Sequence, residues 1–155
     1  MGVEIEKKFL VIGSEWKSLA AGITYRQGYL KSGHGCTVRV RIAGEKGYLT
    51  IKGPVVGAAR PEYEYEIPSL DADEMLETLC DKPLIEKKRY RIPFAEHVWE
   101  VDEFFGENDG LVIAEIELER ADEAFVKPQW IGKEVTGVPH YYNASLVNYP
   151  FKKWT

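Results

Sequence analysis

Residues 3–13 read VEIEKKFLVIG, a run in which charged and apolar residues alternate. Side chains of a β-strand point alternately to opposite faces, so Glu4, Glu6 and Lys8 share one face of a predicted strand. The opposite face is mostly apolar and carries Val3, Ile5, Lys7, Phe9 and Val11. Because Glu4 and Glu6 repel each other, their face is either solvated or arranged to receive a ligand.

The same alternation recurs along most of the chain, which predicts a mainly β protein. Strands are expected at 2–11, 24–32, 35–43, 46–53, 60–68, 83–92, 97–106 and 110–119. The segments between them are rich in Gly, Pro, Asn and Asp and are about as long as hairpin loops. Successive strands are therefore expected to be antiparallel neighbours.

Helical patterns are few and mostly short. Residues 69–82 (SLDADEMLETLCDK) predict a helix, with Ser69 or Asp71 as N-cap and an apolar stripe of leucines and methionine. Shorter helices are predicted at 14–20, 121–126 and 143–149, and a loop with a turn of helix at 127–140. No repeat, low-complexity run or linker divides residues 1–155, so one domain is expected.

Composition narrows the class of protein. With 45% hydrophobic and 29% charged residues, the chain has the composition of a globular protein. Its net charge of −5 argues against a surface for duplex nucleic acid, and no apolar run is long enough for a membrane span. The first residues lack a signal-peptide pattern, so a cytoplasmic protein is predicted, with Cys36 and Cys80 as free thiols.

The charged face of each predicted strand is mostly of a single sign. Basic pairs lie at Arg39 with Arg41 and at Lys87 with Arg89, and Lys52 shares a face with Thr50. The acidic rows of the later strands are Glu62, Glu64 and Glu66; Glu100 and Asp102; and Glu115, Glu117 and Glu119.

These faces have two structural explanations. An antiparallel sheet with one wet side is the commonest source of such alternation. Like charges directly opposite each other destabilise a sheet, however, and the single-sign rows fit that explanation poorly. Alternatively, the eight strands close into a barrel with the charged faces inside, where acids, bases, water and a ligand compensate one another.

The two kinds of charge suit two kinds of ligand. Carboxylates repeating about 6.6 Å apart along a strand suit hard divalent cations such as Mg²⁺ or Mn²⁺. Arginine and lysine rows suit phosphate oxygens, Arg through its planar fork and Lys as a point charge. Both in one cavity would form a site for a metal-bound polyphosphate.

The order of motifs resembles the CYTH domain, also called the triphosphate tunnel metalloenzyme superfamily, and is most similar to its short bacterial inorganic triphosphatases. EIEKK at 4–8 matches the E-x-E-x-K signature of that family. The motifs that follow it in family order are RQGYL at 26–30, VRVR at 38–41, TIKG at 50–53, RPEYEYEI at 60–67, EKKRY at 86–90, WEVDEFFG at 99–106, AEIEL at 114–118 and HYYNASL at 140–146.

The resemblance implies an eight-stranded antiparallel barrel, or tunnel, with a few helices outside, a C-terminal helix and hydrolysis of a triphosphate inside. It implies metal binding by Glu4, Glu6, Glu62, Glu64, Asp102, Glu115 and Glu117, directly or through water. It implies phosphate binding by Lys8, Arg39, Arg41, Lys52, Lys87 and Arg89. Lys52, Tyr29 and Lys8 are the implied catalytic residues, with Mg²⁺ or Mn²⁺ as cofactor.

The resemblance leaves the substrate open, because one fold supports several activities. Inorganic tripolyphosphate is favoured by the compact chain and by RQGYL. The alternatives are an adenylyl cyclase, a thiamine or nucleoside triphosphatase, and a non-catalytic polyphosphate-binding module. The protein is expected to be a monomer or a homodimer, with a small polyphosphate or nucleoside triphosphate as substrate. Tyr142 stands where relatives often carry a basic residue, in a segment that resembles the plug of one tunnel mouth. Glu66 extends an acidic row, and Glu100 and Glu119 are expected at the rim or in solvent.

Overall fold

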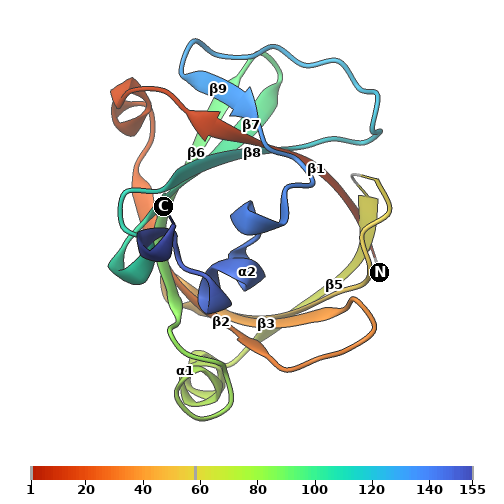
Figure 1. The fold of residues 1–155 in the computed structure, drawn as a ribbon, viewed down its shortest axis with the longest axis vertical. Coiled ribbons are helices and arrows are strands. Elements are labelled where there is room, and N and C mark those ends of the chain that lie inside the picture. Colours follow the sequence, from red (N-terminus) through yellow and green to blue (C-terminus); the bar gives the residue numbers. More distant parts are fainter. Residues whose placement is uncertain (1, 58, 155) are drawn as a thin grey trace.

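The chain folds into a closed antiparallel β-barrel, seen end-on in Figure 1. The computed structural model describes residues 2–57 and 59–154. Each strand of the barrel pairs with its neighbours in the order β5-β4-β3-β2-β6-β7-β8-β1, and β5 pairs with β1 to close the ring. The barrel strands are β1 Gly2–Val11, β2 Gly22–Leu30, β3 Thr37–Ala43, β4 Lys46–Lys52, β5 Ala59–Ile67, β6 Ile85–Phe94, β7 His97–Phe104 and β8 Val112–Glu117.

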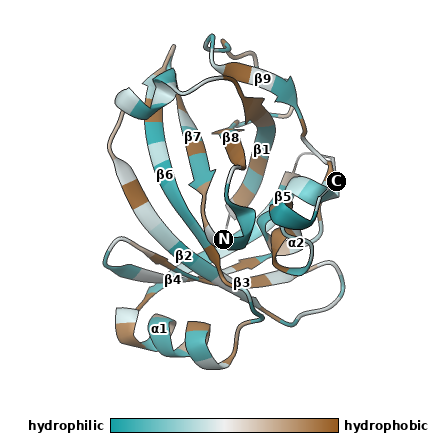
Figure 2. Cartoon of the chain, turned by 60° about the vertical axis from the view of Figure 1, so that its left-hand side comes forward, coloured by the Kyte–Doolittle hydropathy of each residue, from teal (hydrophilic) through white to brown (hydrophobic). Residues whose placement is uncertain are grey.

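All eight predicted barrel strands are confirmed, with ends that shift by about two residues. The prediction of a loop at 127–140 was wrong in one respect, because this segment contains a ninth strand, β9 Ile131–Glu134. This strand pairs with the end of β1, outside the ring, at a register shift between Phe9 and Val11. Figure 2 shows hydrophilic and hydrophobic residues alternating along the strands.

The helices are α1 Ser69–Thr78 and α2 Asn143–Asn148, with 3₁₀ turns η1 Glu15–Ser18, η2 Gly106–Asn108, η3 Pro139–Tyr141 and η4 Phe151–Lys153. Helix α1 ends earlier than predicted, and its N-cap is Pro68 rather than Ser69 or Asp71. The helix predicted at 121–126 was wrong, because that segment is turn and irregular chain. None of the described helices is long and apolar enough to cross a membrane.

The hydrophobic core lies mainly outside the barrel, between its outer surface and the segments that cover it. One cluster joins Phe9 and Trp99, whose ring centroids are 5.5 Å apart, to Trp130 before β9. A second cluster forms where α1 packs on β3 and β4 through Leu76 (Figure 2). Gly47 on β4 permits this close approach, because a Cβ there would lie 2.8 Å from the Cβ of Ala72.

A third apolar cluster lies inside one end of the barrel. Leu146 and Val147 of α2 pack against Ile85, Phe104 and Ile113, whose side chains point inward from three strands. Figure 1 shows α2 within the ring of strands. The C-terminal helix was predicted, and its position closes one end of the tunnel and leaves the charged part of the interior beside it.

Candidate active site

A cavity of about 280 Å³ occupies the charged part of the barrel. The predicted phosphate-binding and catalytic side chains that line it are Lys8, Tyr29, Arg39, Arg41, Lys52, Lys87 and Arg89. The predicted metal-binding acids that line it are Glu4, Glu6, Glu62, Glu64, Glu115 and Glu117. The charged faces therefore turn inward, and the wet-sheet explanation was wrong. The roles of these residues stay predictions.

Strand register explains how side chains far apart in sequence meet in the cavity. Across β1 and β8, Lys8 lies directly opposite Glu115, and Glu6 lies directly opposite Glu117. Across β4 and β5, Lys52 lies directly opposite Glu62. Residues directly opposite each other on one face of an antiparallel pair have Cβ atoms about 5 Å apart, so these side chains interact.

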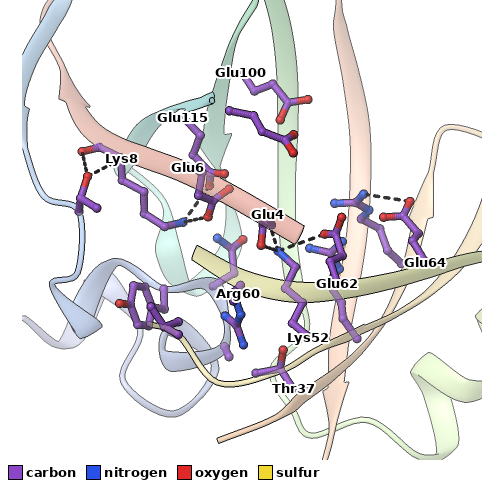
Figure 3. Close-up of a pocket in the computed structure, with 18 of the residues that line it drawn as sticks. Glu4, Glu6, Lys8, Thr37, Lys52, Arg60, Glu62, Glu64, Glu100 and Glu115 are labelled. Carbon is purple, nitrogen blue, oxygen red and sulfur yellow. Dashed lines mark hydrogen bonds and ion pairs between the residues drawn. The ribbon is translucent and has the colours of Figure 1, made fainter. Parts of the chain in front are cut away.

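Two lysines hold the carboxylates of the cavity in ion pairs (Figure 3). The Lys52 Nζ atom lies 2.7 Å from Glu4 Oε2 and 3.6 Å from Glu62 Oε2. The Lys8 Nζ atom lies 2.9 Å from Glu115 Oε1 and 3.7 Å from Glu6 Oε1. Each lysine thus contacts two of the predicted metal-binding acids and neutralises part of their mutual repulsion.

The lysines do not neutralise all of the carboxylates equally. Burial, and then the nearby charge of Glu115, raise the pKa of Glu6 well above its ordinary value. Burial also opposes ionisation of Glu4, but the Lys52 ammonium outweighs it and lowers the pKa of Glu4. Burial acts likewise on Glu115, where Lys8 and then Arg89 lower the pKa well below the ordinary value. Glu6 is therefore the acid of this group that gains most from a further cation.

Asp102 is one predicted metal-binding acid that the structure places behind the cavity. Its Oδ1 accepts from Arg89 Nε at 2.8 Å, and its Oδ2 accepts from Arg89 Nη2 at 2.9 Å. The same Oδ2 lies 2.8 Å from Lys87 Nζ. Asp102 is 1% exposed, and both basic partners are buried. Its carboxylate fixes the orientation of two side chains that face the cavity.

Lys87 is the lysine of the site whose pKa is lowered toward neutral pH. Burial lowers the pKa of Lys87 to about 7; Asp102 opposes this effect and Arg89 adds to it. Its Nζ also donates to Asn143 Oδ1 at 2.9 Å. Asn143 belongs to α2 and also accepts from Gln27 Nε2 at 3.1 Å, so the helix that closes the barrel contacts the charged site directly. Gln27 Nε2 in turn donates to the Tyr29 hydroxyl at 3.2 Å.

Several residues of the cavity were missed by the sequence reasoning. They are Thr37, Val55, Gly57, Arg60, Thr136, Gly137, Asn143 and Ala144. Most of them lie in loops or in α2, where period-two alternation gives no signal. Thr37 and Arg60 lie on strands, and Arg60 is paired directly opposite Glu4. Tyr142 also lines the cavity, with its ring 5.9 Å from Lys8 Nζ.

The rim assignments were partly right. Glu100 was expected at the rim or in solvent, but it lines the cavity and lies 3.3 Å from Arg89 Nη1. Its other carboxylate oxygen pairs with Arg91. Glu66 and Glu119 are exposed.

The donor chemistry fits a hard divalent cation. Glu4, Glu6, Glu115 and Glu117 offer only carboxylate oxygens, which Mg²⁺ and Mn²⁺ prefer. Burial and then the charge of Glu115 raise the pKa of Glu6, and a bound cation would favour its ionised form. Within residues 2–57 and 59–154, no three acids or histidines already converge as a ligand cluster. Lys8 and Lys52 pair with Glu115 and Glu4 instead, so a cation that binds these two carboxylates competes with the lysines.

Comparison with known proteins identifies relatives and solved structures that match nearly the whole chain. An inorganic triphosphatase of Acetivibrio thermocellus is 58% identical over 154 residues, which cover 99% of each chain. An inorganic triphosphatase of Nitrosomonas europaea is 36% identical over 148 residues, 92% of this chain and 95% of that one. A crystal structure of an inorganic triphosphatase matches with a TM-score of 0.66 and 31% identity, over 92% of this chain and 96% of that one.

Proteins with much lower sequence identity share the fold. A putative adenylate cyclase of Bacillus halodurans shares it at 17% identity, with a TM-score of 0.63 over 79% of this chain and 84% of that one. The CYTH domain matches residues 2–145 of this sequence, nearly its full length, and the chain therefore belongs to the CYTH domain family.

Proposed function

We propose that this protein is a metal-dependent triphosphatase that hydrolyses inorganic tripolyphosphate to pyrophosphate and phosphate. The observation that carries the proposal is one small cavity lined by two lysine–carboxylate networks together with Arg39, Arg41 and Arg89. Two full-length relatives named inorganic triphosphatase support the same reaction.

The size of the cavity favours a compact substrate. Its volume of about 280 Å³ lies just below the usual range for ligand sites, roughly 300–1,000 Å³. Helix α2 fills one end of the barrel with apolar side chains, which limits how far a ligand can extend in that direction. An inorganic chain of three phosphates needs no pocket for an organic group.

The basic residues have two roles in this proposal. Arg39, Arg41 and Arg89 bind phosphate oxygens through their guanidinium groups, which are suited to bidentate contacts. Lys8 and Lys52 neutralise charge on the bridging and terminal oxygens, and Lys87 adds a further donor. Such fixed positive charge stabilises the oxygens that gain charge as the phosphoanhydride bond breaks.

A bound Mg²⁺ or Mn²⁺, held by Glu4, Glu6, Glu115 and Glu117, would polarise the phosphate oxygens and the attacking water. Glu62 and Glu64, which also line the cavity, would hold further metal or water. Lys52, Tyr29 and Lys8 are the proposed catalytic residues, because all three line the cavity and match the family motif positions. The oxygen of the water forms the new bond to the terminal phosphorus while the phosphoanhydride P–O bond breaks; pyrophosphate leaves, and the proton of the water passes to solvent or to a phosphate oxygen. No Ser or Cys nucleophile is needed.

The test is phosphate release from tripolyphosphate, ATP and thiamine triphosphate, each with Mg²⁺, with Mn²⁺ and with a chelator, beside an assay for cyclic AMP. We expect metal-dependent release that is fastest with tripolyphosphate, and no cyclic AMP. Glu62→Gln tests a cavity acid, and Glu66→Gln on the same strand is its exposed control. Folded protein that hydrolyses none of these substrates would show that the proposal is wrong.

A further inference from the structure

The aromatic ring of Tyr25 lies among three of the basic side chains of the site. Its centroid is 4.8 Å from Arg41 Cζ, 5.0 Å from Arg89 Cζ and 5.9 Å from Lys87 Nζ. All three distances fall within the roughly 6 Å over which a cation is attracted to the face of an aromatic ring. Tyr25 does not itself line the cavity, whereas its three cationic neighbours do.

Strand register explains why the Tyr25 ring lies close to these three side chains. Tyr25 on β2 lies directly opposite Lys87 on β6. Arg89 is two residues further along β6, and Arg41 on β3 is diagonal to Tyr25 because it pairs with Gln27. Diagonal neighbours on one face lie about 7–8 Å apart, within reach of aromatic and long side chains. One ring therefore reaches cations from the strands on both sides of β2.

The three cations need such a neighbour to different degrees. Arg89 is held by Asp102 through two hydrogen bonds, and Lys87 contacts the same carboxylate. Arg41 has a weaker partner, since its nearest carboxylate oxygen, on Glu64, lies 4.0 Å away. Its buried Nε has no hydrogen-bond partner among the described residues. Burial, followed by the like charges of Arg39 and Arg89, lowers the pKa of Arg41 to about 10.

We propose that Tyr25 is a positioning residue for substrate binding, whose ring face holds Arg41 and Arg89 in place so that both guanidinium groups meet the phosphates. The ring supplies attraction without a negative charge. A carboxylate at this position would form ion pairs with the guanidinium groups and compete with the phosphates for them. An aromatic face gathers the cations without occupying N–H donors, so the donors of Arg41, and those of Arg89 that Asp102 does not bind, stay available to phosphate oxygens.

This inference rests on the proposed function for its substrate, and it is tested first by binding. The variants are Tyr25→Leu, which removes the ring, and Tyr25→Phe, which keeps it. Tyr65→Leu is the matched control, because Tyr65 is exposed on β5. Calorimetric titration with pyrophosphate and with tripolyphosphate, in the presence of a chelator, measures Kd without turnover.

We expect Tyr25→Leu to weaken binding about tenfold, equivalent to about 1.4 kcal/mol, and Tyr25→Phe and Tyr65→Leu to bind as the unchanged protein does. In steady-state assays with metal, Tyr25→Leu should raise KM for tripolyphosphate more than it lowers kcat. A Tyr25→Leu protein with unchanged Kd would overturn the inference. So would a Tyr25→Phe protein that loses as much affinity as Tyr25→Leu, because the hydroxyl would then be responsible.

A second measurement covers a Tyr25→Leu protein that fails to fold. Tyr25→Phe with successive fluorine atoms on the ring keeps the ring's shape but weakens the negative potential of its face. Affinity for pyrophosphate should fall stepwise with fluorination, and an unchanged affinity would overturn the inference. Binding that depends on Tyr25 in a protein that hydrolyses no triphosphate would refute the proposed function alone. Hydrolysis that does not depend on Tyr25 would refute this inference alone, and a protein that binds neither anion would refute both.

Discussion

Lys52 and Glu4 form an ion pair inside the barrel, with Lys52 Nζ 2.7 Å from Glu4 Oε2. Lys52 is proposed to bind phosphate and Glu4 to bind metal. While the two are paired with each other, Lys52 is less available to phosphate and Glu4 is less available to metal. Lys8 and Glu115 repeat this relationship across β1 and β8 at 2.9 Å. Metal and triphosphate are therefore expected to bind cooperatively, because each releases the partner that the other requires.

The first prediction tests this exchange of partners. Lys52→Met should bind Mn²⁺ alone about tenfold more tightly than the unchanged protein, since Glu4 is then free. That factor lies within the usual range for coupling between two sites. Calorimetric titration of Mn²⁺ without phosphate measures it, with the exposed Lys46→Met on the same strand as control. Equal Mn²⁺ affinity in Lys52→Met and the unchanged protein would contradict the exchange.

The second prediction concerns the crowded carboxylate of Glu6. Its raised pKa means that ionisation of Glu6 costs stability in the folded, metal-free protein as pH rises from about 4.5 through the raised value. Glu6→Gln should therefore melt about 2–4 °C higher than the unchanged protein at neutral pH with a chelator, the effect of about 1 kcal/mol in a chain of this size. The same variant should lose metal-dependent hydrolysis.

Thermal melts at two pH values separate this cause from general stabilisation. The advantage of Glu6→Gln should be largest at neutral pH and should shrink at acidic pH, where Glu6 itself is protonated. Saturating Mg²⁺ should raise the melting temperature of the unchanged protein more than that of Glu6→Gln. An advantage that is independent of pH would assign the effect to something other than charge.

Period-two alternation was enough to predict the barrel and most of its lining. It specifies which face of a strand a residue occupies, and a closed ring turns every such face toward one interior. Alternation does not specify which inward-facing side chains form ion pairs with neighbouring strands and so do not line the cavity. Asp102 was therefore assigned to the metal-binding acids and Glu100 to the rim or solvent. In the structure Arg89 lies directly opposite Asp102 and binds it behind the cavity, and it is Glu100 that lines the cavity.

Segments in which charged and apolar residues do not alternate could not be placed in the fold from their sequence. The position of α2 inside the barrel depends on Leu146 and Val147 meeting inward apolar residues from three distant strands. Asn143 and Tyr142 reach the cavity only because of that packing. The four-residue strand β9 was missed because its pairing with β1 is set by the register of a distant partner rather than by its own pattern.

The third prediction follows from the burial of Asp102. Asp102→Asn leaves Arg89 and Lys87 without their shared carboxylate, and breaking a buried ion pair in this way costs about 3–5 kcal/mol. Urea unfolding of the metal-free protein measures the change. Glu103→Gln is the control, because the neighbouring Glu103 pairs with the half-exposed Lys17, and such pairs contribute about 0–1 kcal/mol.

The contrary outcome for Asp102 would be informative as well. Asp102→Asn protein of unchanged stability that fails to respond to Mg²⁺ would return Asp102 to the metal ligands implied by the family resemblance. The structure favours the ion-pair role, because both Asp102 oxygens already accept from basic side chains at 2.8–2.9 Å.

The last prediction concerns the charge of Lys87. Its pKa is lowered to about 7 by burial, so in the metal-free protein part of its population is neutral at pH 7 and most is neutral at pH 8. A bound phosphate anion favours the charged form and raises this pKa. Binding of pyrophosphate at pH 8 should therefore take up close to one proton, and at pH 6, where Lys87 is already charged, it should take up much less on its account.

Calorimetry in two buffers of different ionisation enthalpy measures this proton uptake. Pyrophosphate also titrates in this range, so the decisive quantity is the difference between the unchanged protein and Lys87→Met. That difference should grow from pH 6 to pH 8, and affinity should fall with rising pH more steeply in the unchanged protein than in Lys87→Met. Identical proton uptake by the two proteins at pH 8 would mean that Lys87 stays charged in the free site, held so by Asp102 at 2.8 Å.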